Sequence, residues 1–376
     1  GMEVLKAVRE AVGPDFVGGM RITGDEFHPD GLSHEDMRQI AAYYDATGLV
    51  DYFGVVGSGC DTHNTLANVI PNMSYPPAPF LHLAAGIKEV VKVPVIHAQN
   101  IKDPNQAQRI LAAGYVDFVG MTRAHIADPH FITKIKMNQV DQIRQCVGAN
   151  YCIDRQYMGL DVLCIQNAAT SREYLGLPHI IEKTAGPVRN VVVVGGGPGG
   201  MEAARVAAER GHKVTLLEKG SELGGQITIA AKAPQRDQMA GITRWLAMEL
   251  ERLGVTVSFG VNADAATVRD LRPDVCILAT GGQPFLEQNP EWGAAEGLVV
   301  SSWDILTGAV EPGKNVLVYD SICEFSGMSA ADYLASKGAL VELVTGDIKP
   351  GVGIGGTTFP TYYRSLYEKA VIMTSD

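Results

Sequence analysis

The sequence contains little of several features that mark other protein classes. Aromatic residues make up 7% and charged residues 19% of its 376 residues, and no run of Lys or Arg offsets the formal net charge of −11. Nucleic-acid binding is therefore disfavoured, because neutralising phosphates requires a basic face. No apolar stretch reaches the ~18 residues of a membrane span, and the N-terminal residues lack the pattern of a signal peptide. We therefore expect a cytoplasmic protein that binds neither nucleic acid nor membrane.

Cysteine is also scarce, and its distribution is uneven. Six cysteines are too few for a disulfide scaffold in a chain of this length. Three of them, Cys146, Cys152 and Cys164, fall within nineteen residues, which indicates chemistry rather than crosslinking. The content of 46% hydrophobic residues is sufficient for packed cores. At ~150 residues per domain, the length indicates two or three packed units.

The first 140 residues predict a parallel α/β architecture, because short strands alternate with amphipathic helices. Four strand-and-helix units are expected, which is half of a (β/α)8 barrel. The region is therefore either an open sheet or a barrel that the chain enters partway. Residues 57–79 form a polar excursion rich in Gly and Pro, which is too long for a plain connection and is expected to be functional. The expected strands are 16–22, 52–56, 94–98 and 117–121, and the expected helices are 2–12, 33–47, 81–91, 104–113 and one from about 128.

A glycine-rich turn later in the chain carries the strongest motif. Gly195, Gly197 and Gly200 follow the apolar strand 190–194 and open an alanine-rich helix, and Glu218 ends the next strand. In such turns the first glycine permits a tight bend, the second lets backbone amides approach a pyrophosphate and the third lets the helix pack on the strand. The helix N-terminus stabilises the anion, and the acid accepts hydrogen bonds from ribose hydroxyls. The pattern predicts a dinucleotide site.

Two further glycine-containing segments are typical of a flavoprotein version of this fold. Gly225 and Gln226 lie in the first, and Gly281 lies in the second, which reads Ala-Thr-Gly-Gly. Two ordinary loops are the alternative interpretation. A second nucleotide-type unit is expected from strand 315–319 onward, with helix 329–337, strand 340–344, helix 362–369 and strand-like residues 370–373.

This second unit lacks the glycine motif. The turn from Asp320 to Gly327 reads Asp-Ser-Ile-Cys-Glu-Phe-Ser-Gly, with no glycine where the backbone must meet a pyrophosphate. Its two acidic residues, Asp320 and Glu324, oppose an anion at a helix N-terminus. We therefore expect that this unit keeps the fold and has lost nicotinamide binding.

The three clustered cysteines have the spacing of an iron-sulfur site with one position replaced. Five residues separate Cys146 from Cys152, eleven separate Cys152 from Cys164, and Ala149 stands where another thiol is expected. Soft thiolates suit iron-sulfur clusters or zinc. Three thiolates can hold a three-iron cluster, a four-iron cluster with an outside ligand, or nothing. Three buried thiols without a metal are the alternative.

Polar residues lie at or just after the carboxyl ends of three of the expected strands in the first region. Arg21 lies at the C-terminal end of the first strand. The pairs Gln99 with Asn100 and Gly120 with Arg123 follow the last two strands. Barrel enzymes place functional groups, and often a phosphate site, at these strand ends. We therefore predict a flavin phosphate site, with a surface ion pair as the alternative for the arginine of the first strand.

Together these motifs resemble the old yellow enzyme superfamily in its iron-sulfur branch, which includes trimethylamine dehydrogenase, 2,4-dienoyl-CoA reductase and histamine dehydrogenase. In that branch an FMN barrel is followed by a four-cysteine loop and two nucleotide-type domains. The resemblance covers the chain from near the fifth barrel strand to inside the C-terminal region, and implies an internal portion of a longer protein. It implies a partial (β/α)8 FMN-type barrel at 1–140, the C-terminal half of the barrel; an iron-sulfur loop and linker at 141–185; an FAD- or ADP-binding Rossmann-like domain at 186–311; a degenerate nucleotide-type domain at 312–350; and a return to the first nucleotide domain at 351–376.

The resemblance also implies roles for single residues. Arg21 approaches the FMN pyrimidine edge, while Gln99, Asn100 and Arg123 line the FMN phosphate. The three clustered cysteines are cluster ligands, and FAD or ADP is bound by Gly195, Gly197, Gly200, Glu218 and Gln226.

This sequence departs from the family pattern in three places. Ala149 replaces the second cluster cysteine, which changes the possible cluster type. Asn100 stands where the reductases have arginine, which removes one phosphate contact. The turn from Asp320 to Gly327 resembles trimethylamine dehydrogenase rather than the reductase, so NAD(P)H is not expected to supply electrons. The cysteine loop is most similar to that of N-methyl amino acid demethylases, such as those acting on dimethylglycine or N-methylproline.

The resemblance therefore implies an amine dehydrogenase of the oxidative demethylation type. Electrons from a small methylated amine or amino acid would pass from FMN through the cluster to an external carrier such as an electron-transferring flavoprotein. The alternatives are an NAD(P)H-dependent 2,4-dienoyl-CoA or enoate reductase, and an inactive nucleotide-binding fragment. A half barrel exposes strand edges, which favours a homo-oligomer. Asp61, His63 and Tyr75 of the excursion are weak candidates for substrate contacts, with a solvated loop as the alternative.

Overall fold

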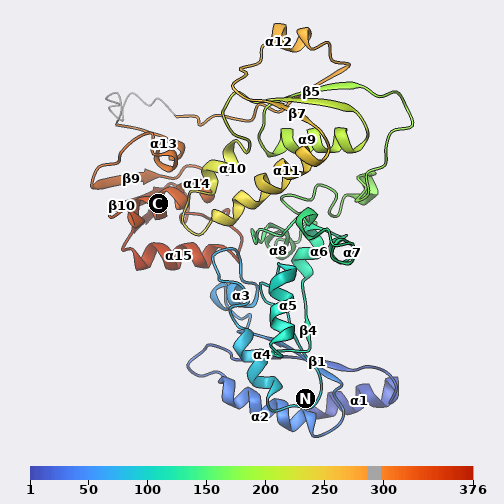
Figure 1. Cartoon of the computed structure of the whole chain (residues 1–376). Helices are drawn as coiled ribbons and strands as arrows, with labels where there is room; N and C mark the ends of the chain where they lie inside the picture. Colours follow the sequence, from blue (N-terminus) through green and yellow to red (C-terminus); the bar gives the residue numbers. More distant parts are fainter. Residues whose placement is uncertain (287–297, 376) are drawn as a thin grey trace. The chain divides into compact units, whose positions relative to one another are not determined.

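The computed structural model describes residues 1–286 and 298–375. In this part of the chain the strands form three parallel sheets, so the expected α/β class is confirmed (Figure 1). No helix among these residues is both long enough and apolar enough to cross a membrane. The chain folds into two compact units whose segments alternate along the sequence. The first unit comprises Gly1–Val140, Gly148–Ile165 and Gly355–Thr361, and the second comprises Asp141–Val147, Gln166–Ile354 and Tyr362–Asp376.

The first unit is built around a four-stranded sheet. Its strands β1 (Gly19–Thr23), β2 (Tyr52–Val56), β3 (Val95–His97) and β4 (Phe118–Val119) lie side by side in sequence order. Every neighbouring pair is parallel, so the carboxyl ends of all four strands lie at the same edge. The loops that follow the strands are thereby brought together at that edge.

Helices connect the strands of the first unit. A capping box begins the second of these helices at Ser33, whose side chain accepts a hydrogen bond from the backbone of Asp36, while the Asp36 side chain accepts one from the backbone of Ser33. The excursion 57–79 contains an unpredicted helix, because Thr62 and Thr65 form a similar box. The helices are α1 (Met2–Val12), α2 (His34–Asp45), α3 (His63–Val69), α4 (Leu81–Lys88), α5 (Pro104–Ala112), α6 (Thr122–Ala127), α7 (Phe131–Lys136) and α8 (Tyr151–Tyr157).

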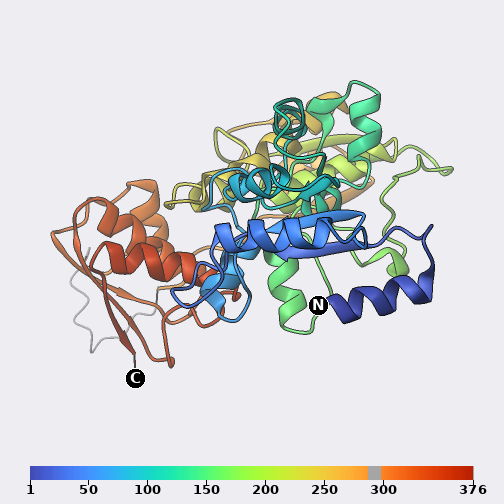
Figure 2. The ribbon, with the colours of Figure 1, turned by 90° about the horizontal axis from the view of Figure 1, so that it is seen from below.

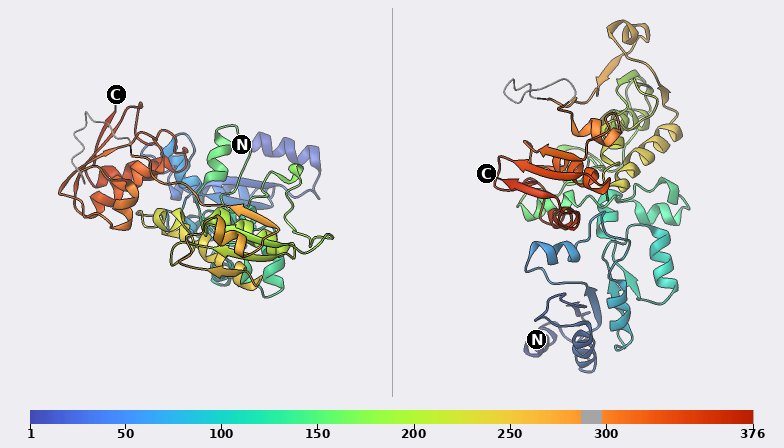
Figure 3. Two further views of the ribbon diagram at one scale, coloured as in Figure 1. Left: turned by 90° about the horizontal axis from the view of Figure 1, so that it is seen from above. Right: turned by 90° about the vertical axis from the view of Figure 1, so that its left-hand side faces the viewer.

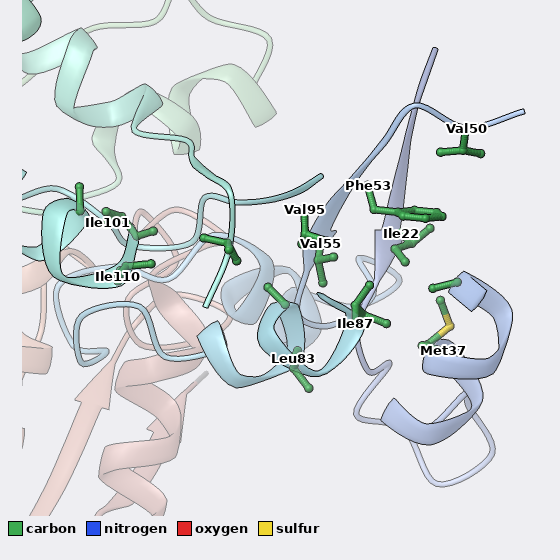
Figure 4. Close-up of a cluster of buried hydrophobic side chains, with 14 residues drawn as sticks. Ile22, Met37, Val50, Phe53, Val55, Leu83, Ile87, Val95, Ile101 and Ile110 are labelled. Carbon is green, nitrogen blue, oxygen red and sulfur yellow. The ribbon is translucent and has the colours of Figure 1, made fainter. Parts of the chain in front are cut away.

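One face of the first sheet is buried against α2 and α4. Figure 4 shows Ile22, Phe53 and Ile87 among the apolar side chains that gather between strands and helices. Burying side chains of this size contributes roughly 1.5–3 kcal/mol each, so this layer holds the sheet in place.

The opposite face of the sheet carries the alternate residues of each strand. Arg21 pairs in register with Gly54, and Gly54 pairs with Ile96. Arg21 is exposed, and Phe118 at the end of the same row is 55% exposed. This face is therefore open in the described chain.

The second unit contains two further parallel sheets. The first of them has the strand order β7-β6-β5-β8, which is the order of a doubly wound nucleotide-binding sheet. Its elements are β5 (Asn190–Val194), α9 (Pro198–Glu209), β6 (Lys213–Leu217), α10 (Gln226–Ala230), α11 (Ala240–Arg252), β7 (Thr256–Ser258), α12 (Ala265–Asp270) and β8 (Val275–Leu278).

The other sheet of this unit has the order β11-β10-β9, seen in orange and red in Figure 3. The Ser329 hydroxyl of α14 and the Tyr362 hydroxyl of α15 form a hydrogen bond of 3.0 Å, and the two helices lie side by side in Figure 2. The first of these helices begins at Phe325, four residues before the predicted start. The elements are α13 (Ser302–Thr307), β9 (Asn315–Tyr319), α14 (Phe325–Ser336), β10 (Leu340–Thr345), α15 (Phe359–Glu368) and β11 (Ile372–Ser375).

A buried histidine predicts a pH-dependent stability. Burial lowers the pKa of His97 to about 4, although its Nδ1 lies 3.1 Å from the Val55 carbonyl oxygen. The unfolded imidazole binds a proton near its ordinary pKa of 6.5, so protons favour the unfolded chain in this interval. We expect the free energy of unfolding to fall by about 3 kcal/mol as the pH decreases from above 6.5 towards 4. Urea unfolding should show a flatter pH profile for His97→Asn. Equal profiles would contradict this assignment.

Candidate functional site

The first candidate site lies at the carboxyl edge of the first sheet. Arg21 lies in the middle of β1 and not at the end of the strand as predicted, because the strand begins at Gly19 and continues to Thr23. Its side chain forms no hydrogen bond or ion pair with any residue that the structure describes. Its strand neighbour Gly54 has no side chain, and a Cβ atom added there would lie 4.0 Å from the Arg21 Cα atom. The guanidinium is therefore available on the open face of the sheet.

Gln99 holds the excursion in place rather than facing an open site. Its Oε1 atom accepts a hydrogen bond of 2.6 Å from the Gly57 amide. Its Nε2 atom donates to the carbonyl oxygens of Gly57, Asn68 and Val69 at 2.8–3.1 Å. The side chain is 4% exposed, so these bonds use the capacity of the amide inside the loop.

Two buried polar atoms beside Gln99 have no partner among the described residues. Asn100 has a left-handed backbone (φ 55°) and donates through Nδ2 to the Tyr75 and Pro76 carbonyls, while its Oδ1 atom is unpaired. The Ser58 hydroxyl, for which the sequence carries no prediction, is 1% exposed and also unpaired. Unpaired buried polar atoms are costly, and they fit the hydroxyl and ring N–H groups of a flavin. The position of Ser58 between two glycines was the signal that could have revealed it.

Arg123 follows β4 and supplies the second cation of this edge. Its Nη1 atom donates to the Pro71 carbonyl at 2.9 Å and to Oδ1 of Asn150. Gly120 precedes it and packs so closely that an added Cβ atom would lie 2.8 Å from the Cβ atom of Ala98. A guanidinium held by one nitrogen keeps its other donors for an anion such as phosphate.

The weak substrate candidates of the excursion have structural partners. Asp61 accepts a hydrogen bond of 2.9 Å from the Thr65 hydroxyl at the start of α3. The Tyr75 hydroxyl donates to Oδ1 of Asn68 at 2.8 Å. His63 is exposed and lies next to Gly356, where an added Cβ atom would be 2.6 Å from the His63 Nδ1 atom. Asp61 and His63 are exposed and Tyr75 is half-buried; of the three, the histidine is the one whose side chain forms no hydrogen bond with another described residue.

The cysteine cluster is divided between the two units. Cys152, which is buried, and Cys164 belong to the first unit, and Cys146 belongs to the second. Each unit taken by itself therefore holds at most two of the three thiols. Within residues 1–286 and 298–375, no group of three His, Cys, Asp or Glu side chains that could hold a metal ion is found. No disulfide involves these thiols, so the donor set retains the soft sulfur chemistry that an iron-sulfur cluster requires.

The chain on either side of the cysteine segment is joined within the second unit. Gln166 donates to the Gln145 carbonyl at 2.6 Å, and Arg144 donates to the Gln166 carbonyl at 2.8 Å. The Arg144 guanidinium lies 4.2 Å from the ring centroid of Trp245, whose indole N–H donates to the Gln142 carbonyl at 3.0 Å. A desolvated cation over an indole contributes up to about 2 kcal/mol. The residues on both sides of the cysteine segment are therefore attached to α11 through Arg144.

The second candidate site lies between β5 and α9. Gly195 has φ 110°, and an added Cβ atom would lie 2.3 Å from the Ala279 carbonyl oxygen. At Gly200 the added atom would lie 1.9 Å from the Gly195 oxygen, whereas at Gly197 it would meet nothing within 4 Å. Helix α9 has no side-chain cap at its N-terminus. Two glycines therefore allow close packing, and the third faces open space at uncapped backbone amides, which suits a pyrophosphate.

The other predicted residues of this site surround the same turn. Gly225 has φ 49°, and an added Cβ atom would lie 3.2 Å from the Gly197 Cα atom. Gln226 donates to the Gly282 carbonyl at 3.3 Å, which places it beside Gly281. Glu218 accepts hydrogen bonds from the Gly196 amide at 2.7 Å and the Gly220 amide at 2.6 Å. Its carboxylate retains acceptor capacity for ribose hydroxyls.

The corresponding turn after β9 is filled by a side chain. Asp320 is 3% exposed, and its Oδ1 atom accepts a hydrogen bond of 3.0 Å from the Cys323 amide. Burial raises the pKa of Asp320 above its ordinary range. A Cβ atom on Gly327 would lie 2.4 Å from the Asp320 Cγ atom. The carboxyl group therefore lies where a pyrophosphate would approach the turn.

Two regions of the chain match known families. Residues 1–142 match the NADH:flavin oxidoreductase / NADH oxidase family. Residues 190–257 match the FAD dependent oxidoreductases. The first region contains the polar edge of the first sheet, and the second contains the glycine-rich turn and Glu218.

Related proteins align along nearly the whole chain. An N,N-dimethylglycine/sarcosine dehydrogenase of Chromohalobacter salexigens is 78% identical, covering 100% of this chain and 55% of that protein. A probable N-methylproline demethylase of Rhizobium meliloti is 42% identical, covering 99% and 54%. The structure of histamine dehydrogenase from Rhizobium sp. 4-9 matches with a TM-score of 0.89 at 25% identity, covering 99% and 55%. The chain spans about half the length of the curated relatives it matches.

The open space at Gly197 predicts a selective effect of one substitution. Gly197→Asp should leave the fold intact, because an added Cβ atom meets nothing within 4 Å. The new carboxylate should weaken the binding of FAD or ADP at least about tenfold, because it opposes the pyrophosphate. Isothermal titration with both ligands measures this change. Gly346→Asp, where an added Cβ atom also meets nothing, is the matched control. Unchanged affinity in Gly197→Asp would refute the site.

Proposed function

Because the chain belongs to the NADH:flavin oxidoreductase / NADH oxidase family, we propose that it is part of a flavin-dependent enzyme that oxidatively demethylates a small N-methylated amine or amino acid. The observation that carries this proposal is the 78% identity, along the entire chain, with a protein named N,N-dimethylglycine/sarcosine dehydrogenase. The probable N-methylproline demethylase supports the same substrate class. Both names describe the removal of electrons or methyl groups from a methylated nitrogen.

In this proposal the first sheet is the C-terminal half of a (β/α)8 barrel. The sequential order of its four parallel strands supports this, because barrel strands neighbour one another in chain order. The open face with Arg21 would then face the barrel interior. The carboxyl edge would carry the active site, as it does in other barrel enzymes.

The residues of this edge fit FMN. Arg21 would bind the pyrimidine edge of the flavin, and Arg123 would bind its phosphate. The unpaired Ser58 hydroxyl and Asn100 Oδ1 atom would bond to flavin polar groups. The chemistry that bound FMN supplies is acceptance of a hydride equivalent from the N-methyl carbon, leaving an iminium that water hydrolyses to formaldehyde and the demethylated amine. The side chains named here bind and orient, and His63 is the candidate for contact with the amine.

The glycine-rich turn would bind the adenine part of FAD or of ADP. Gly197 and the N-terminus of α9 would receive the pyrophosphate, and Glu218 would bind the ribose. The Asp320 carboxyl group in the other nucleotide-type turn supports the expectation that nicotinamide binding is lost there. An external acceptor, such as an electron-transferring flavoprotein, would then take the electrons.

Cys146, Cys152 and Cys164 would hold an iron-sulfur cluster. Their thiolates are the soft ligands that such clusters need, and Ala149 leaves one position for an outside ligand. The chemistry the cluster supplies is one-electron transfer. The hydrogen bonds of Gln166 with Gln145 and Arg144 support this role, because they join the chain at both ends of the cysteine segment.

The choice of reductant tests the proposed activity. Anaerobic addition of dimethylglycine or sarcosine to the flavin-loaded protein should bleach the flavin absorbance, whereas NADPH should not. Gly346→Asp, which leaves the candidate sites unchanged, should respond to each reductant as the unmodified protein does. Bleaching by NADPH instead would favour the enoate reductase, and bleaching by neither would favour the inactive fragment.

Iron content tests the metal ligands. Cys152→Ser should abolish iron binding and the electron paramagnetic resonance signal of the reduced protein, because serine is a poor ligand for these clusters. Cys276→Ser, at an exposed cysteine outside the cysteine segment, should change neither. Iron and sulfide analysis after anaerobic purification provides the measurement. Iron-free unmodified protein would contradict the cluster.

A further inference from the structure

A directed chain of buried hydrogen bonds in the first unit ends on Arg123. Arg123 donates to Oδ1 of Asn150, Asn150 donates through Nδ2 to the Thr357 hydroxyl at 3.0 Å, and that hydroxyl donates to Oδ1 of Asp154 at 2.8 Å. Asn150 and Thr357 are 207 residues apart in the sequence. The chain therefore connects a cation to an anion through two neutral side chains from different segments.

The donors and acceptors in this chain can be arranged in one direction only. A guanidinium only donates and an ionised carboxylate only accepts. The Asn150 amide nitrogen also faces the Ile70 carbonyl at 2.8 Å, and that oxygen can only accept. The Asn150 oxygen must therefore face Arg123, and the Thr357 hydroxyl must direct its hydrogen to Asp154. Every bond thus runs from the cation towards the anion, and bonds aligned in this way polarise one another.

The far end of the chain is rigid. Asp154 is 8% exposed, and its carboxylate also accepts hydrogen bonds from the Thr357 amide at 2.9 Å and the Thr358 hydroxyl at 3.2 Å. A Cβ atom on Gly355 would lie 2.0 Å from the Asp154 Cγ atom, so the segment passes as close as glycine permits. Thr357 is 0% exposed and Asn150 is 2% exposed. Water therefore does not compete for these bonds.

We propose that Asp154, Thr357 and Asn150 are positioning residues that fix Arg123 for the phosphate of FMN. The inference deepens the proposed function and rests on it. The chain occupies only the Nη1 atom of Arg123, together with the Pro71 carbonyl at 2.9 Å, and its other nitrogens form no hydrogen bond with the described residues. The negative charge of Asp154 stabilises the guanidinium through the aligned bonds. A cation held in place before binding loses less side-chain entropy when the phosphate arrives.

This inference also assigns a task to the segment Gly355–Thr361, which lies outside both matched family regions. Thr357 is the residue of this segment that bonds to both Asn150 and Asp154. Thr361 lies in the same segment, is also buried at 7% exposure, and bonds to the Thr358 carbonyl and to Asn72 instead. Comparing substitutions at Thr357 and Thr361 therefore distinguishes a role in phosphate binding from a role in packing.

The test compares FMN with riboflavin, which lacks the phosphate. Dissociation constants of both flavins, measured by fluorescence quenching in the full chain, give the preference for the phosphate. Arg123→Met should lower this preference about tenfold or more, because a charge-assisted contact is lost. Thr357→Val should lower this preference roughly three- to tenfold, because it removes the hydroxyl that links Asn150 to Asp154. Thr357→Ser keeps a hydroxyl and should restore the preference. Thr361→Val, the matched control, should leave the preference unchanged.

The double variant separates the possible outcomes. Arg123→Met with Thr357→Val should lower the preference no further than Arg123→Met alone, because both changes act on one contact. Asp154→Asn keeps the shape of the side chain, removes its charge and should also lower the preference. It provides the test if Thr357→Val does not fold. An unchanged preference in Thr357→Val and Asp154→Asn, with a lowered one in Arg123→Met, would overturn this inference alone. Absence of FMN binding, or an unchanged preference in Arg123→Met, would overturn the proposed phosphate site with it.

Discussion

Parallel strand pairing is the constraint on which both candidate sites depend. Neighbouring parallel strands end at one edge, so the loops that follow them meet there whatever their sequences are. In the first unit this brings residues after β2, β3 and β4 together, although helices and the excursion separate them in the sequence. In the second unit the same constraint brings the turn after β5 to the end of β8, where Gly195 contacts Ala279. Local chemistry then decides what each edge can bind.

The two nucleotide-type turns of the second unit show how a few atoms change that chemistry. After β5, open space beside Gly197 and uncapped amides of α9 leave room for an anion. After β9, the Asp320 carboxyl group occupies the equivalent place and bonds to the backbone itself. The fold of the two turns is similar, while one is open to a ligand and the other carries an internal substitute for it.

Local patterns in the sequence were sufficient for much of the fold. The strands 52–56, 190–194 and 315–319 were predicted with their observed bounds, because apolar runs between turn residues define them. Helix α3 was missed because its short cap lies inside a polar segment. The internal bonds of Gln99 and the contacts of Thr357 could not be predicted, because they depend on which distant backbone groups each side chain meets. Burial also decides whether Ser58 is paired, and no local pattern encodes that.

The first unit is discontinuous, and this has a consequence for biosynthesis. Its last segment, Gly355–Thr361, is translated after nearly all of the second unit. Domains usually fold in the order in which they leave the ribosome. Here the carboxylate of Asp154 and the amide of Asn150 meet Thr357 only after it has been translated, so the N-terminal unit cannot be completed before most of the second unit has been made. A nascent chain stalled before Thr357 would contain most of the nucleotide-type unit, while its N-terminal unit would still lack the segment that completes it.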